Sequence, residues 1–149
     1  MNTSATLGVV AAAMVAAIAL PATAHADSPS FVFESPSGNI VCQMTTAADG
    51  TGAVACDVED TTYAPPRSGP DWCDPFSLDQ GSTPNAHCHT DVAVPGTPFG
   101  HGRAVDMLGY GQTRSVGAIT CDSEPAGITC TDASTGHYFR VSPESYELG

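Results

Sequence analysis

The chain of 149 residues has a formal net charge of −12, with 16 acidic residues against four arginines and no lysine. Nucleic acids and anionic membrane surfaces bind clustered cations, so this composition excludes both as partners. Leu, Ile, Val and Phe supply only 20 of the 123 residues that follow residue 26, and a fraction below roughly 20% at high net charge is typical of disorder. Six cysteines argue for a folded domain instead.

The first element in the chain is a predicted signal peptide, cleaved after residue 26. The apolar run at residues 7–20 is shorter than the roughly 20 residues that span a membrane core. Ala24, His25 and Ala26 then supply the small-x-small pattern of a cleavage site. We therefore expect a secreted protein, extracellular or associated with the cell envelope. Its mature part, residues 27–149, is expected to be one small disulfide-rich β domain without a membrane span.

Short apolar runs separated by glycine and proline follow, which is the pattern of strands and turns. Residues 31–33 predict a first strand, and residues 39–44 and 53–58 predict a hairpin around a polar loop. Pairing Cys42 with Cys56 sets a register that brings apolar residues to one face, as a half-buried sheet requires. The residues on that face are Ile40, Cys42, Met44, Val54, Cys56 and Val58.

A second cysteine hairpin is predicted at residues 117–123 and 128–130, across a four-residue loop. Its register pairs Cys121 with Cys130. The segment between the hairpins, residues 61–100, is rich in proline, glycine and aspartate, so we expect it to be irregular. Cys73 and Cys88 are the remaining pair and would staple this segment.

Further strands are expected at residues 103–108 and 137–141. The predicted fold is therefore all-β, a small antiparallel sheet or sandwich of short strands and hairpins stapled by three disulfides. In an exported protein an even set of cysteines implies such a framework. Each closed loop of about 15 residues contributes on the order of 3 kcal/mol, so we expect the disulfides to decide whether the chain folds.

The two cysteine hairpins resemble each other. Residues 38–42 and residues 117–121 both run from a glycine through an isoleucine to a cysteine, and Tyr63 and Tyr138 follow the second cysteine of each unit at similar distances. Two interpretations stay open at this point: a remnant of duplication, or two independent cysteine hairpins.

Four stretches in order resemble the motifs of a known family. The opening resembles "F-x-S/T-P-S-G-N-I-x-C", and the closing stretch resembles "G-H-G-F-x-x-S-R-x-x-Y-x-L", with Tyr138 and Pro143 departing from that pattern. The stretches are residues 33–42, 88–92, 108–111 and 136–148. The chain thus resembles a family of secreted, cysteine-containing actinobacterial proteins of unknown function. The resemblance implies export, disulfides and the β fold, and it implies no reaction.

Two clusters of His, Cys or Asp residues are candidate metal sites. His87, Cys88 and His89 have the residue types of a zinc site, but a disulfide sulfur supplies no thiolate, so solvated histidines are the favoured interpretation. Asp71, Asp74 and Asp79 lack the spacing of a calcium loop, and aspartates of this kind commonly form turns. We therefore predict no metal site and no cofactor.

His137 is the one candidate functional residue, because it belongs to the closing motif. Its structural alternative is an imidazole bonded to a backbone carbonyl beside a glycine turn. No Gly-x-Ser-x-Gly elbow is present, and no catalytic residue is assigned. The leading hypothesis is a secreted, non-enzymatic binding module for an unknown extracellular protein or ligand. The alternatives are a small secreted hydrolase that uses His137 with a carboxylate, and a structural component of the cell envelope.

Overall fold

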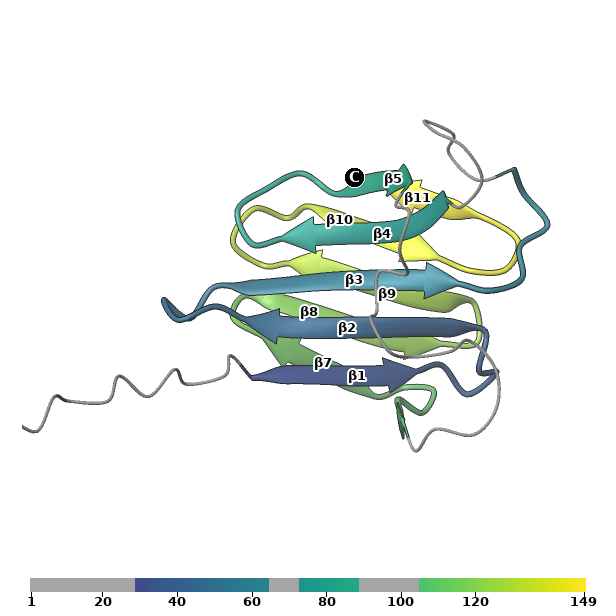
Figure 1. Ribbon diagram of the computed structural model, residues 1–149, viewed down its shortest axis with the longest axis horizontal. Helices are drawn as coiled ribbons and strands as arrows, with labels where there is room; N and C mark the ends of the chain where they lie inside the picture. Colours follow the sequence, from purple (N-terminus) through teal and green to yellow (C-terminus); the bar gives the residue numbers. More distant parts are fainter. Residues whose placement is uncertain (1–28, 65–72, 89–104) are drawn as a thin grey trace, which may run out of the picture.

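The computed structural model describes residues 29–64, 73–88 and 105–149, and these form two stacked β-sheets (Figure 1). The predicted signal peptide lies outside the described residues. The first sheet has the strand order β5-β4-β3-β2-β1-β6. Its strands are β1 (Ser30–Glu34), β2 (Ile40–Thr46), β3 (Gly52–Val58), β4 (Cys73–Asp79), β5 (Asn85–Cys88) and β6 (Asp106–Met107).

The second sheet has the order β11-β10-β9-β8-β7. Its strands are β7 (Thr113–Val116), β8 (Ile119–Glu124), β9 (Gly127–Asp132), β10 (Tyr138–Val141) and β11 (Tyr146–Leu148). Every strand pair is antiparallel except β1 and β6, which are parallel. The described residues contain no helix, so the all-β prediction is confirmed.

Both predicted hairpin registers are confirmed. Cys42 lies opposite Cys56 in β2 and β3, and Cys121 lies opposite Cys130 in β8 and β9. The second hairpin is tighter than predicted, because Glu124 pairs with Gly127. The turn therefore holds two residues instead of four.

Two other predictions about strands need correction, and two strands were not predicted. The segment expected to be irregular contains the β4–β5 hairpin, because Phe76 and Leu78 alternate with polar residues and bury one face. The strand expected at residues 103–108 is, in its described part, only the two-residue β6. The edge strands β7 and β11 were not predicted, since both are short and neither has alternating buried apolar residues.

The core fills the space between the two sheets. β4 packs against β10, β2 against β7 and β3 against β8, and the rings of Phe76 and Phe139 lie 6.3 Å apart across the interface. Each buried strand contributes alternate residues to this core. The largest side chains that are fully buried there are Phe33, Phe76, Phe139, Met44, Leu78, Ile119, Ile128 and Val141.

The two described disulfides lie within the sheets. Cys42–Cys56 joins β2 to β3 with a Cα–Cα distance of 4.1 Å, and Cys121–Cys130 joins β8 to β9 with one of 4.0 Å. All four cysteines are fully buried in the core. Neither bond connects one sheet to the other. The backbone register places Cys73 opposite Cys88, and their disulfide stays a prediction.

A set of hydrogen bonds joins the sheets at one end, and we call it the inter-sheet latch (Gly52, Gln80, Gly81, Ala118 and Asp132). The Gln80 Oε1 atom accepts the backbone N–H of Gly52 at 3.0 Å and that of Ala118 at 2.9 Å. Gly52 begins β3, whereas Ala118 lies in the turn between β7 and β8. One amide oxygen thus bonds to both sheets.

The backbones at this latch approach too closely for side chains. A Cβ atom on Gly52 would collide with the backbone carbonyl of Val116. Gly117 has a φ of +54°, and a Cβ atom there would collide with the Gln80 amide oxygen. Because only glycine fits such a close approach, these two positions fix how the β2–β3 hairpin meets the second sheet.

Asp132 completes the latch from the end of β9. Its side chain is fully buried, and its carboxylate accepts the Gly81 N–H at 2.6 Å, the Ser134 hydroxyl at 2.6 Å and the Ser134 N–H at 2.8 Å. These bonds, the one from Gly81 first, lower the pKa of Asp132 from 3.8 to about 2. Buried and satisfied by several donors, the carboxylate holds the β4–β5 turn against the second sheet.

Asp132→Asn should destabilise the protein by about 2 kcal/mol at neutral pH, because a hydrogen bond to a charged group is lost inside the protein. The folded-state pKa of Asp132 lies below its unfolded value of about 3.9. Its contribution is therefore complete above about pH 4 and is lost as the pH falls through about 2. Urea denaturation across this pH window should show a flatter acid dependence in the variant. The exposed Glu124→Gln is the control, and an equal flattening there would contradict the assignment.

Full reduction of the disulfides should unfold the protein at neutral pH and low salt. Apolar burial stabilises by about 25 cal/mol per Å2, the core is thin, and the charge of −12 adds self-repulsion in the compact state. Added salt should partly restore compactness by screening the carboxylates. Circular dichroism with and without reductant across a salt series measures this. A reduced chain that keeps a cooperative melt at low salt would show that the core suffices alone.

Candidate functional site

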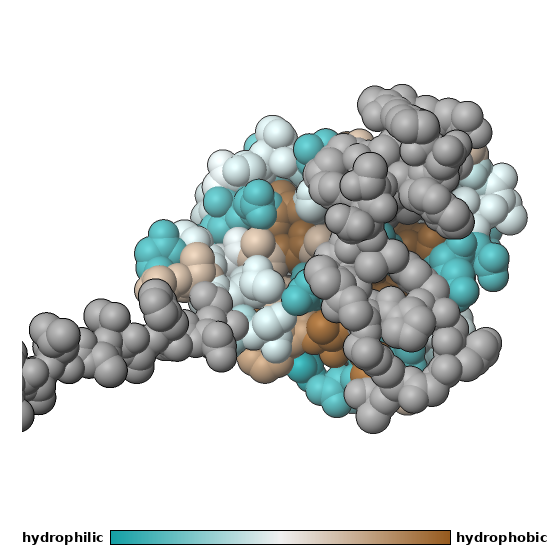
Figure 2. Space-filling view, in the orientation of Figure 1, coloured by the Kyte–Doolittle hydropathy of each residue, from teal (hydrophilic) through white to brown (hydrophobic). Residues whose placement is uncertain are grey.

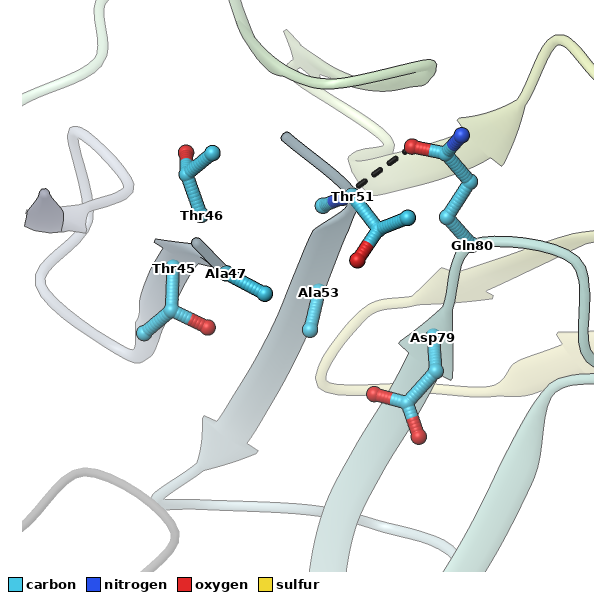
Figure 3. Close-up of a pocket in the computed structure, with 8 residues that line it drawn as sticks. Thr45, Thr46, Ala47, Thr51, Ala53, Asp79 and Gln80 are labelled. Carbon is cyan, nitrogen blue, oxygen red and sulfur yellow. Dashed lines mark hydrogen bonds between the residues drawn. The ribbon is translucent and has the colours of Figure 1, made fainter. Parts of the chain in front are cut away.

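A groove of about 400 Å3 opens beside the latch, at the end of the first sheet where β2 turns into β3 (Figure 3). Hydroxyl, carboxylate and amide side chains line it together with small residues. The lining residues are Thr45, Thr46, Ala47, Thr51, Gly52, Ala53, Asp79 and Gln80. The left end of the molecule, where this turn lies in Figure 1, shows mainly hydrophilic and pale surface in Figure 2.

The strand register explains the shape of the groove. Thr45, Ala53 and Asp79 are cross-strand neighbours on β2, β3 and β4. Alternate residues point to opposite faces of a strand, and the adjacent Val54 and Leu78 are buried in the core, so this row points outward. The small alanine between two larger side chains leaves a notch whose walls are the threonine and the carboxylate (Figure 3).

Hydrogen bonds fix one wall of the groove. Thr51 donates its hydroxyl to the Asp49 carboxylate at 2.7 Å and its backbone N–H to the same oxygen at 3.0 Å. These two bonds, the hydroxyl first, lower the pKa of Asp49 below 3.8. Gln80 is oriented by the two N–H groups that its oxygen accepts. The groove therefore has a preorganised rim.

His137 lies away from this groove, just before β10. Its Nδ1 atom is 3.3 Å from the backbone oxygen of Gly149, and its own N–H donates to the Thr135 hydroxyl at 3.2 Å. A backbone oxygen only accepts, so Nδ1 is the donor in this bond. Within the described residues no Asp or Glu side chain is bonded to the His137 ring. This geometry agrees with an imidazole bonded to a backbone oxygen, and a functional role of His137 stays a prediction.

The neighbouring Tyr138 uses its hydroxyl in a different way. It donates to the Glu147 carboxylate at 2.6 Å across β10 and β11, and this bond raises the pKa of Tyr138 above 10.0. Arg140 donates its Nε–H to the Thr129 hydroxyl at 3.0 Å. These contacts link neighbouring strands on the outer face of the second sheet.

Of the residues weighed as metal ligands, only Asp79 has a described side chain. It lies in the groove, while Asp71 and His89 lie outside the described residues, and the side chains of Asp74, His87 and Cys88 are likewise outside. In the described part of the chain no three His, Cys, Asp or Glu side chains gather as a metal site would require. That part also contains no helix able to span a membrane.

The groove was not predicted from the sequence. The sequence predicts only a polar loop for the segment that contains Thr45, Thr46 and Thr51. It suggests a role for Asp79 only as a calcium ligand. One signal was available: the Cys42–Cys56 register already places Thr45 opposite Ala53. The sequence did not predict β4, the strand that brings Asp79 to the other side of Ala53.

Comparison with known proteins identifies a family. No curated protein and no solved structure matches this chain. The model of a family of unknown function, DUF6636, matches residues 12–148, which is most of the chain and includes both disulfide-bonded hairpins. The protein therefore belongs to the DUF6636 family of unknown function.

Proposed function

We propose that this protein is an exported, non-enzymatic binding module whose ligand occupies the groove at the β2–β3 turn. The observation that carries the proposal is the groove itself: a polar notch of about 400 Å3 whose rim is held by hydrogen bonds within the chain. Pockets for small ligands commonly begin at roughly 300 Å3 and hold a few convergent polar groups. The groove has both properties.

The frame of the groove is stiff. Thr45 and Ala53 lie on β2 and β3, the two strands that the Cys42–Cys56 disulfide joins. Gln80 and Gly52 belong at once to the groove and to the inter-sheet latch. A preorganised site loses less conformational entropy when a ligand binds, so this construction favours recognition.

The hydrolase alternative has less support. It needs His137 paired with the side chain of an Asp or Glu, whereas Nδ1, the atom that such a side chain would contact, is bonded to the main-chain oxygen of Gly149. No observation specifically favours the structural component of the cell envelope. Export rests on the apolar run at residues 7–20 and on the paired cysteines, since disulfides persist in oxidising compartments.

Export predicts that the secreted protein begins at Asp27. Signal peptidase cleaves after small residues at the −3 and −1 positions, which Ala24 and Ala26 supply. Intact-mass measurement and N-terminal sequencing of the protein from culture medium check the site. Ala26→Arg should block processing and leave the apolar run attached. Recovery of the unsubstituted chain with residues 7–20 still present would refute cleavage.

Filling the groove should abolish binding. Ala53→Trp places a large ring on the floor between Thr45 and Asp79, whereas Thr113→Trp, on the exposed edge strand β7, is the matched control. On an array of extracellular peptides and glycans, Ala53→Trp should lose at least tenfold in retained signal. The control and His137→Ala should each keep the signal of the unsubstituted protein.

Three outcomes would count against the proposed function. The first is an array signal that Ala53→Trp leaves intact, and the second is no array signal at all. The third is turnover of an ester, peptide or glycoside substrate that His137→Ala abolishes, because this would establish the hydrolase instead.

A further inference from the structure

The groove has a carboxylate on its wall and no Lys, Arg or His among its lining residues. Asp79 is exposed at its wall, and its carboxylate has no partner among the described residues. An ionised carboxylate only accepts. Thr51 gives its single hydroxyl hydrogen to Asp49, so its oxygen offers a ligand lone pairs and no donor. Two of the polar groups at the rim can therefore only accept.

The backbone donors around the groove are already used. Thr46 donates to the carbonyl of Pro29 at 3.0 Å and Ala47 to that of Thr51 at 2.9 Å. Gly52 donates to the Gln80 amide oxygen at 3.0 Å, and Gln80 donates its N–H to the Gly52 carbonyl at 2.9 Å. Anion sites depend on free N–H groups or cations. The groove has no lining Lys, Arg or His, and the N–H groups that Gln80 keeps on its amide nitrogen belong to the residue next to the Asp79 carboxylate.

The charge of the whole chain acts in the same direction. A net charge of −12 disfavours an anionic ligand at any part of the surface. The two arginines with described side chains are engaged elsewhere. Arg114 lies over the Phe31 ring at 5.5 Å and 3.8 Å from Asp106, and Arg140 donates to Thr129. The ligand that fits this charge is a cation.

A bare metal ion fits less well than an organic cation. Calcium takes 6–8 oxygen ligands, several of them carboxylates, and Asp79 is the one carboxylate among the lining residues. Ala47 and Ala53 give the groove an apolar floor beside that carboxylate. A lysine side chain has the matching form, because its methylene stem packs on apolar surface while its ammonium group donates three hydrogen bonds.

We infer that the groove binds a lysine side chain of a partner polypeptide, with the ammonium group held by Asp79 and the hydroxyl oxygen of Thr51, and the stem lying on Ala53. The inference rests on the proposed function, since it names the ligand class of the same groove. The carboxylate supplies the charge, and the threonine oxygen accepts a second hydrogen from the same ammonium.

The test is a titration of the disulfide-intact protein with the peptide acetyl-Gly-Lys-Gly-amide, followed by amide chemical shifts at low salt. Saturable shifts should be confined to the groove and include Thr45, Thr51 and Gly52. Added salt should weaken binding. Asp79→Asn should raise Kd about fivefold, the size expected for one exposed ion pair.

Two controls make the result specific. Glu124→Gln removes the same charge from the β8–β9 turn and should leave Kd within twofold. The Nε-acetylated peptide keeps the stem and removes the charge, and it should bind at least fivefold more weakly. Unchanged thermal melts would show that both variants are folded.

Each remaining outcome overturns the inference. Equal binding of the acetylated peptide in the groove would refute the cationic ligand and leave the binding module standing. Shifts spread over the acidic surface, with the same response in Asp79→Asn and Glu124→Gln, would show nonspecific charge attraction. Absence of any saturable shift would also refute lysine as the ligand, whereas the array experiment decides the proposed function independently.

Discussion

Each sheet is organised around one buried cross-strand disulfide. In the first sheet a single row crosses four strands through Phe33, Cys42, Cys56 and Phe76. In the second sheet the corresponding row is Arg114, Cys121, Cys130 and Phe139. Because each disulfide closes a loop within one hairpin, it restricts the unfolded chain locally and leaves the contact between sheets to packing and to the inter-sheet latch.

The two rows support the duplication interpretation over two independent hairpins. Both sheets contain a meander of five antiparallel strands with the disulfide between the second and third, and a phenylalanine follows the second cysteine on the fourth strand. The two sheets also differ at one position that affects how they are joined. Where the first sheet has Val58 two residues after its second cysteine, the second sheet has the buried Asp132. This polar replacement supplies the carboxylate of the latch.

The sequence allowed the fold class and both hairpin registers to be predicted, since Cys42, Cys56, Cys121 and Cys130 sit among alternating apolar residues. It did not allow β4 to be predicted, because Asp74 and Pro75 interrupt the alternation that Phe76 and Leu78 complete. Alternation of apolar and polar residues reveals a strand only through the apolar residues on its buried face. A strand with two buried apolar residues is hard to tell from a loop.

The candidate site could not be predicted for a different reason. The motifs that carried the family resemblance consist largely of core residues: Phe33, Ile40, Cys42, Leu108 and Phe139 are all buried. Such motifs identify how the chain packs and say little about what it binds. The groove comes from register across three strands, and from hydrogen bonds such as Gln80 to Gly52 that join residues 28 positions apart.

The latch and the groove share Gly52 and Gln80, and this sharing links stability to recognition. In a protein with a thin core, few apolar contacts are available to hold a binding surface in shape. Here the Gln80 amide oxygen that accepts the Ala118 N–H of the second sheet also accepts the Gly52 N–H at the groove. The bond between the sheets therefore fixes the side chain of Gln80, which is adjacent in sequence to Asp79. The shape of the groove thus depends on how the two sheets are joined.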